Sequence, residues 1–168
     1  MRTDRIAVLV AFVSSVAVAN WLVTNIGPVP VGLGLMAPAG VFMAGLGFTI
    51  RDSLHELGGV RWVAVGIVSG ALLSAWVSSA DLALASATAF AVAETADLAV
   101  YSPLRERHWH LALVLSNVVG TVLDSVIFLW LAFGSLEFLQ GQVWGKWVAT
   151  AFAIAAVVGF RRRAWSST

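Results

Sequence analysis

The sequence predicts an all-α integral membrane protein that folds as one domain over residues 1–168. Of its 168 residues, 60% are hydrophobic and only 11% are charged, whereas soluble domains are about one quarter charged. The mean hydropathy is +0.90. Six apolar segments follow one another along the chain, and each is long enough for a helix to cross a hydrocarbon core about 30 Å thick. These observations together predict six transmembrane helices.

The predicted helices are separated by short polar or glycine-rich stretches, which are typical of turns between membrane spans. They cover residues 6–23, 31–50, 62–79, 82–103, 110–133 and 143–160. The net charge of +1 gives no indication of nucleic-acid binding. The absence of cysteine excludes disulfides, thiolate chemistry and cysteine-ligated metals.

The second predicted helix is rich in glycine and contains Pro38, so the sequence predicts either close helix packing with a kink or a broken helix that presents free carbonyl groups to a ligand. Its end carries the charged residues Arg51, Asp52, His55 and Glu56. Because Asp52 and Glu56 are one helical turn apart, they share a face. This cluster is either a solvated helix end or a gate of ion pairs formed by Arg51, Asp52 and Glu56.

The distribution of basic residues predicts that both termini are cytoplasmic. With the N-terminus inside, nine of the ten Lys and Arg residues fall at the inner side, and only Lys146 falls outside. Both termini on one side require an even number of spans, which agrees with six. The predicted location is therefore the cytoplasmic (inner) cell membrane, with several spans across the lipid bilayer.

Two acids within the fourth predicted helix are the strongest indication of function. Glu94 and Asp97 are three residues apart and share one helix face, which Tyr101 continues one turn later. A charged side chain at the bilayer centre costs roughly 2.5–3.5 kcal/mol on insertion scales. These acids therefore line either a polar pocket or ion path, or form a hydrogen-bonded clamp between helices.

The fifth predicted helix carries a matching polar face, formed by Asn117, Thr121 and Asp124. If helices four and five pack antiparallel, Asp97 and Asn117 lie at nearly the same depth. We expect no Lys or Arg at that depth, so protons, a cation or a donor-rich ligand must neutralise the acids. The candidate substrate-binding residues are Glu94, Asp97, Asn117, Asp124, Thr121, Tyr101 and, at the outer end of the first helix, Asn20.

Other chemistries are not indicated. The paired histidines His108 and His110 are a weak basis for a metal site, because they are two residues apart at a membrane edge. No nucleophile–base motif, zinc-protease motif or phosphate-binding loop is present. We therefore predict no enzyme activity, no catalytic residues, no metal and no cofactor.

Four motifs resemble those of the vitamin uptake transporter (VUT) family, whose characterised members are queuosine precursor transporters. They are PAGVFMAGLGFTIRD at 38–52, AFAVAETADLAVYSPLR at 89–105, SNVVGTVLDSVIF at 116–128 and AFG at 132–134. Asp52, Glu56 and Gly59 are similar to the family's D-x-x-x-E-x-aromatic-Gly pattern, with Gly58 in place of the aromatic residue.

This resemblance implies import of 7-deazaguanine bases, such as 7-cyano-7-deazaguanine, across the cytoplasmic membrane. It also implies a six-helix fold similar to the substrate-binding subunits of energy-coupling-factor transporters. Two alternatives remain open: a binding subunit for another purine-like base or vitamin that needs a separate energising partner, and a structural membrane protein that uses its acids as clamps. The energy source and a homo-oligomeric state also remain open.

Overall fold

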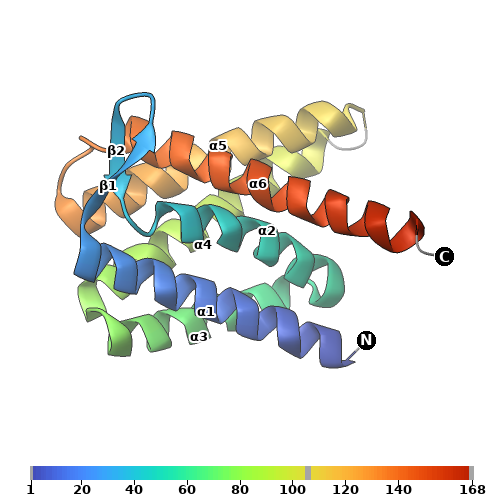
Figure 1. Cartoon of the computed structure of the whole chain (residues 1–168), viewed down its shortest axis with the longest axis horizontal. Coiled ribbons are helices and arrows are strands. Elements are labelled where there is room, and N and C mark those ends of the chain that lie inside the picture. The colour runs from blue at the N-terminus through green and yellow to red at the C-terminus, as the bar shows by residue number, and fades with distance from the viewer. Residues whose placement is uncertain (1, 105–106, 167–168) are drawn as a thin grey trace.

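The computed structural model describes residues 2–104 and 107–166, which form six helices and one β-hairpin. The elements follow in the order α1 (Arg2–Ile26), β1 (Pro28–Gly32), β2 (Leu35–Pro38), α2 (Val41–Gly58), α3 (Val60–Val77), α4 (Ala80–Leu104), α5 (Trp109–Phe133) and α6 (Leu139–Ser166). The helices lie roughly alongside one another in a single bundle (Figure 1).

Glycines end two of the helices because they adopt backbone angles that other residues rarely take. Gly59 has a φ of 72° and separates α2 from α3, and its N–H donates to the carbonyl of His55. Gly134 has a φ of 65° and ends α5, with its N–H donating to the carbonyl of Trp130. Gly134 is in the left-handed helical region, and such a glycine just after the last helical turn is a common helix stop.

A β-hairpin replaces the first part of the second predicted helix, so the prediction of a helix over 31–50 was wrong at its start. Strand β1 pairs antiparallel with β2, and Leu33 and Gly34 connect them with φ angles of 54° and 73°. Two such residues in succession are typical of a tight hairpin turn. Pro38 pairs with Pro28 in the ladder and does not kink a helix.

The hairpin is held against α6. The indole nitrogen of Trp144 donates a hydrogen bond of 3.2 Å to the backbone carbonyl of Val31. Val31, Ala37 and Val41 form a small buried cluster on which Trp144 packs. This contact fixes the hairpin beside the start of α2 and the first turns of α6.

Helix α2 packs closely against α6, so the backbone at Gly45 approaches the backbone at Lys146. A Cβ atom added at Gly45 would lie 2.7 Å from the backbone oxygen of Lys146. The hydroxyl of Thr150 donates to the carbonyl of Gly45 at 3.2 Å. Small residues allow this kind of backbone approach between membrane helices.

The helix surfaces suit a lipid environment. Four stretches are long and apolar enough to cross a membrane by length and composition: Asp4–Ile26, Val60–Val77, Ala80–Leu104 and Val114–Phe133. Large apolar side chains such as Leu72 and Trp76 are 70% and 84% exposed on the outside of the bundle. The chain is therefore an all-α multi-pass membrane protein with a short hairpin added.

Both ends of the chain lie at one end of the bundle, and the hairpin lies at the other (Figure 1). The turn between α2 and α3, the end of α4 and the start of α5 are at the same end as the termini. We call the two ends of the bundle the terminus side and the hairpin side.

Candidate functional site

A cavity occupies the hairpin-side half of the bundle and is lined by all six helices. The space inside it, including the part open to solvent, is about 700 Å³. Most of the lining is apolar. Its polar side chains are Ser15, Asn20, Ser86, Asp124, Gln142 and Lys146. We call this space the hairpin-side cavity.

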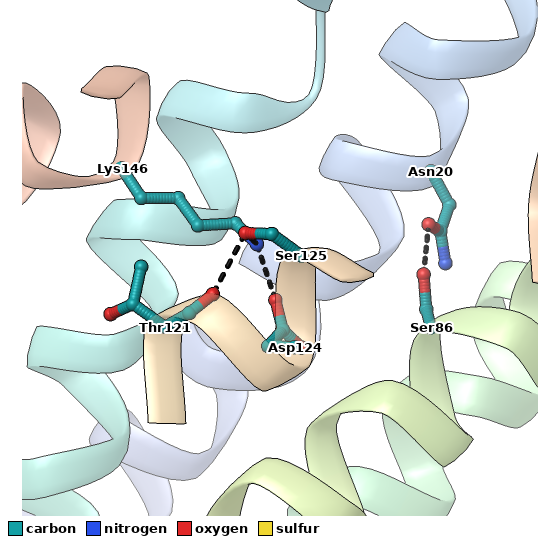
Figure 2. Close-up of polar contacts among 6 residues, drawn as sticks. All are labelled: Asn20, Ser86, Thr121, Asp124, Ser125 and Lys146. Carbon is teal, nitrogen blue, oxygen red and sulfur yellow. Dashed lines mark hydrogen bonds and ion pairs between the residues drawn. The ribbon is translucent and has the colours of Figure 1, made fainter. Parts of the chain in front are cut away.

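Lys146 and Asp124 form a buried ion pair on the wall of this cavity. The ammonium group of Lys146 contacts a carboxylate oxygen of Asp124 and also donates to the hydroxyl of Ser125 at 2.8 Å (Figure 2). Ser125 in turn donates to the backbone carbonyl of Thr121 at 2.8 Å. Lys146 is 2% exposed and Asp124 is 6% exposed. Burial of either charge alone would be costly, so each depends on the other.

The structure changes two expectations. The sequence assigns Lys146 to the outer side, whereas the structure buries it inside the bundle, two turns into α6, which begins at Leu139. The expectation that no basic residue neutralises the acids is also wrong, since Lys146 contacts Asp124 directly. The available signal was a single cation within an otherwise apolar and aromatic run, VWGKWVATAF, which in a membrane span indicates an interior role.

Two further polar side chains of the cavity have unused hydrogen-bonding groups. Ser86 donates to the side-chain oxygen of Asn20 at 2.6 Å (Figure 2). The amide nitrogen of Asn20 and the side-chain oxygen of Gln142 are buried and have no hydrogen-bond partner among the described residues. Both residues are 2% exposed. Such groups are uncommon in folded proteins, and here a donor and an acceptor line the same cavity.

Phenylalanine side chains line the terminus-side end of the cavity. The rings of Phe48 and Phe90 are stacked, with centroids 5.1 Å apart and planes 15° from parallel. Phe12 packs against Phe90 at 5.5 Å and a tilt of 56°. These three rings provide flat apolar surfaces on which a planar ligand can stack.

A smaller pocket lies on the terminus side of these rings. Its volume is about 210 Å³. It is lined by Phe48, Arg51, Ala93, Glu94, Asp97, Asn117, Gly120 and Thr121. Phe48 therefore lines both spaces. We call this second space the terminus-side pocket.

Arg51 and Glu94 form a second buried ion pair on the wall of this pocket. The side chains are 7% and 9% exposed. Arg51 also contacts Asp52 at 2.9 Å through its Nε atom, and its Cζ atom lies 5.6 Å from the ring centre of Phe48. Arg51 is thus inside the bundle, which corrects both the reading of this end of α2 as wholly solvated and the expectation that Glu94 has no basic neighbour.

The predicted binding residues divide between the two spaces. The terminus-side pocket holds Glu94, Asp97, Asn117 and Thr121, as their predicted shared faces require. The hairpin-side cavity holds Asn20 and Asp124. Tyr101 lines neither space. Of the predicted gate residues, Arg51 is buried, whereas Asp52 and Glu56 are exposed.

The two spaces share one chemical character. In each space, a cation can donate hydrogen bonds, a carboxylate can accept them, and an aromatic ring offers a stacking surface. Each space therefore suits a neutral planar ligand with donors and acceptors along one edge. Among the described residues, no group of three or more His, Asp or Glu side chains could hold a metal ion.

The family model described as "Putative vitamin uptake transporter" matches residues 71–160. This span covers more than half of the 168 residues and includes α4, α5 and the cavity-lining part of α6. No curated protein and no solved structure matches the chain.

Proposed function

Because the chain belongs to the vitamin uptake transporter family, we propose that it imports a 7-deazaguanine base, a queuosine precursor such as 7-cyano-7-deazaguanine, across the cytoplasmic membrane. The family assignment itself gives a membrane uptake transporter for a small molecule. The choice of base rests on the four motifs quoted above and on the chemistry of the hairpin-side cavity, where we place the bound base.

The observation that carries this proposal is the Lys146–Asp124 pair on the cavity wall, beside the ring of Phe48. The edge of a guanine-like base presents a ring N–H and an exocyclic amine next to a carbonyl oxygen. A carboxylate accepts both N–H groups, and an ammonium group donates to the carbonyl. The flat ring system can then stack on phenylalanine. The net-neutral charge pair suits a net-neutral base.

Asn20 and Gln142 extend this set around the cavity. The free amide nitrogen of Asn20 can donate to a ring nitrogen or nitrile of the ligand, and the free oxygen of Gln142 can accept an N–H. A ligand that supplies both partners removes two buried unsatisfied groups, each of which costs about 1–3 kcal/mol. These residues therefore favour a ligand with polar atoms at more than one edge.

The proposed orientation in the membrane rests on the position of the basic residues. Apart from the buried Arg51 and Lys146, the Lys and Arg residues that the structure describes lie at or near helix ends on the terminus side (Figure 1): Arg2, Arg5, Arg61, Arg107 and Arg161 to Arg163. Basic residues near span ends favour the cytoplasm. The terminus side is therefore cytoplasmic in our proposal, and the hairpin-side cavity receives the base from outside.

The test is binding of 7-cyano-7-deazaguanine to purified wild type and Asp124→Asn. The amide offers an N–H where the carboxylate accepted one, so a charge-assisted contact worth about 1.5–3 kcal/mol is lost. Affinity should fall roughly tenfold to a hundredfold. Asp81→Asn is the matched control, because Asp81 is an exposed acid in the first turn of α4.

Competition sharpens the same experiment. Guanine should displace the base, whereas adenine should compete poorly, because adenine presents an acceptor where guanine presents the ring N–H. Thermal unfolding of each variant establishes that it is folded. Equal affinity of folded wild type and Asp124→Asn would remove the carboxylate from the site, and lack of any binding by wild type would refute the choice of base.

A further inference from the structure

Both ion pairs lie close to one phenylalanine, Phe48. The ammonium nitrogen of Lys146 is 5.9 Å from its ring centre, and the Cζ atom of Arg51 is 5.6 Å from the same centre. Each of these cations is paired with a carboxylate. Phe48 lines both the hairpin-side cavity and the terminus-side pocket, so the two spaces adjoin at this residue.

We propose that the terminus-side pocket is a second binding site for the same class of ligand, a neutral planar base with adjacent N–H and carbonyl groups. The base reaches it from the hairpin-side cavity before release. This inference rests on the proposed transport function and adds a second binding step to it. Glu94 takes the part that Asp124 plays in the first site and accepts the N–H groups of the base.

The walls of the pocket supply more than one contact for such a ligand. Asp97 lies one turn after Glu94 on the same face of α4, and Asn117 and Thr121 face them from α5. These groups can accept and donate hydrogen bonds along a second edge of the base. Four polar side chains together with Phe48 therefore match the chemistry of the cavity.

Occupation of the pocket requires a local movement. Its volume is about 210 Å³, against about 700 Å³ for the cavity, so the pocket is the tighter space. Rotation of Phe48 would open the way between them. The N–H groups of the base would then replace Arg51 on Glu94, and Arg51 can turn toward Asp52, which it already contacts at 2.9 Å. After the exchange, Glu94 is hydrogen-bonded by the base and Arg51 is paired with Asp52, so neither buried charge is left without a partner.

The experiment compares binding and uptake of 7-cyano-7-deazaguanine by the same purified preparations, reconstituted in lipid vesicles. Two variants alter the pocket without removing either member of the Arg51–Glu94 pair. Asp97→Asn removes a carboxylate that lines the pocket, and Gly120→Leu fills the pocket. Val118→Leu is the matched control, because Val118 is an exposed residue of α5 that lines neither space.

Both pocket variants should lower the maximal uptake rate by about tenfold or more while affinity at the cavity changes by less than about twofold, the pattern of a step after first binding. The Val118→Leu control should transport at close to the wild-type rate. Wild-type uptake by folded Asp97→Asn would overturn the second site. So would a parallel loss of binding and uptake, because it would place Asp97 in the first site. Failure of wild type to bind the base refutes the proposed function instead.

Discussion

The two ion pairs use the same chemistry in different surroundings. Lys146 and Asp124 are enclosed by all six helices, and a hydroxyl group also satisfies the lysine. Arg51 and Glu94 lie nearer the terminus side, in a pocket that also contains the exposed Asn117, and Arg51 is shared with the exposed Asp52. The first pair is therefore a fixed feature of the fold, whereas the second has a partner to which it can switch. A transporter needs both kinds of site, one to recognise its ligand and one to let it pass.

The largest expected effect comes from removing one cation. Lys146→Met leaves the carboxylate of Asp124 buried without its partner, which should lower the free energy of unfolding by about 3–5 kcal/mol. Arg51→Met should cost less, because Glu94 shares its pocket with the exposed Asn117, whereas Asp124 and Lys146 are enclosed by all six helices. Denaturant unfolding in detergent micelles measures both. The double variant Lys146→Met/Asp124→Asn should recover much of the loss, because the unpaired charge is then gone.

Equal destabilisation by Lys146→Met and Arg51→Met would break the contrast between the two pairs. It would mean that both are equally closed to water, and that Arg51 is as firmly held as Lys146.

A smaller effect is expected at Asp52, which tests whether Arg51 can change partners. The Asp52 side chain is 58% exposed, so Asp52→Ala should change stability by less than about 0.5 kcal/mol. Without this partner, Arg51 loses the carboxylate that it already contacts at 2.9 Å when the base displaces it from Glu94, so turnover should fall severalfold while binding stays unchanged. Uptake kinetics and equilibrium binding measure the two quantities, with Glu56→Ala, another exposed acid of α2, as the control. An unchanged uptake rate would leave Asp52 as a solvated helix-end residue.

The bundle itself was largely predictable from sequence because membrane helices are long and uniformly apolar. The predicted segments 62–79, 82–103 and 110–133 correspond to α3, α4 and α5 with boundaries that differ by a few residues. The hairpin was not predicted, because glycine, proline and valine in residues 28–38 fit an interrupted membrane helix as well as a short pair of strands. The pairing of Pro28 with Pro38 in the structure shows that these residues form a pair of strands.

The site was predicted in part, and the missing part has one physical cause. Glu94, Asp97, Asn117 and Thr121 share a pocket because helical spacing places them on facing surfaces of α4 and α5. Their cations come from α2 and α6, which are distant in sequence and approach through small residues such as Gly45. Charge counting assigns every Lys and Arg to a membrane edge. Among the residues whose side chains the structure describes, Arg51 and Lys146 depart from this rule, because each is paired with an acid inside the bundle.

The most direct test of the account is an experimental structure of the protein with 7-cyano-7-deazaguanine bound. We predict ligand density in the hairpin-side cavity, with the N–H edge of the base within hydrogen-bonding distance of Asp124, its carbonyl oxygen at Lys146, and its ring against Phe48. Occupancy of the terminus-side pocket should be lower, and should rise in a conformation open to the cytoplasm. Density for the base only between Asp97 and Asn117, with the Lys146–Asp124 pair undisturbed and the cavity without ligand density, would contradict the central claim.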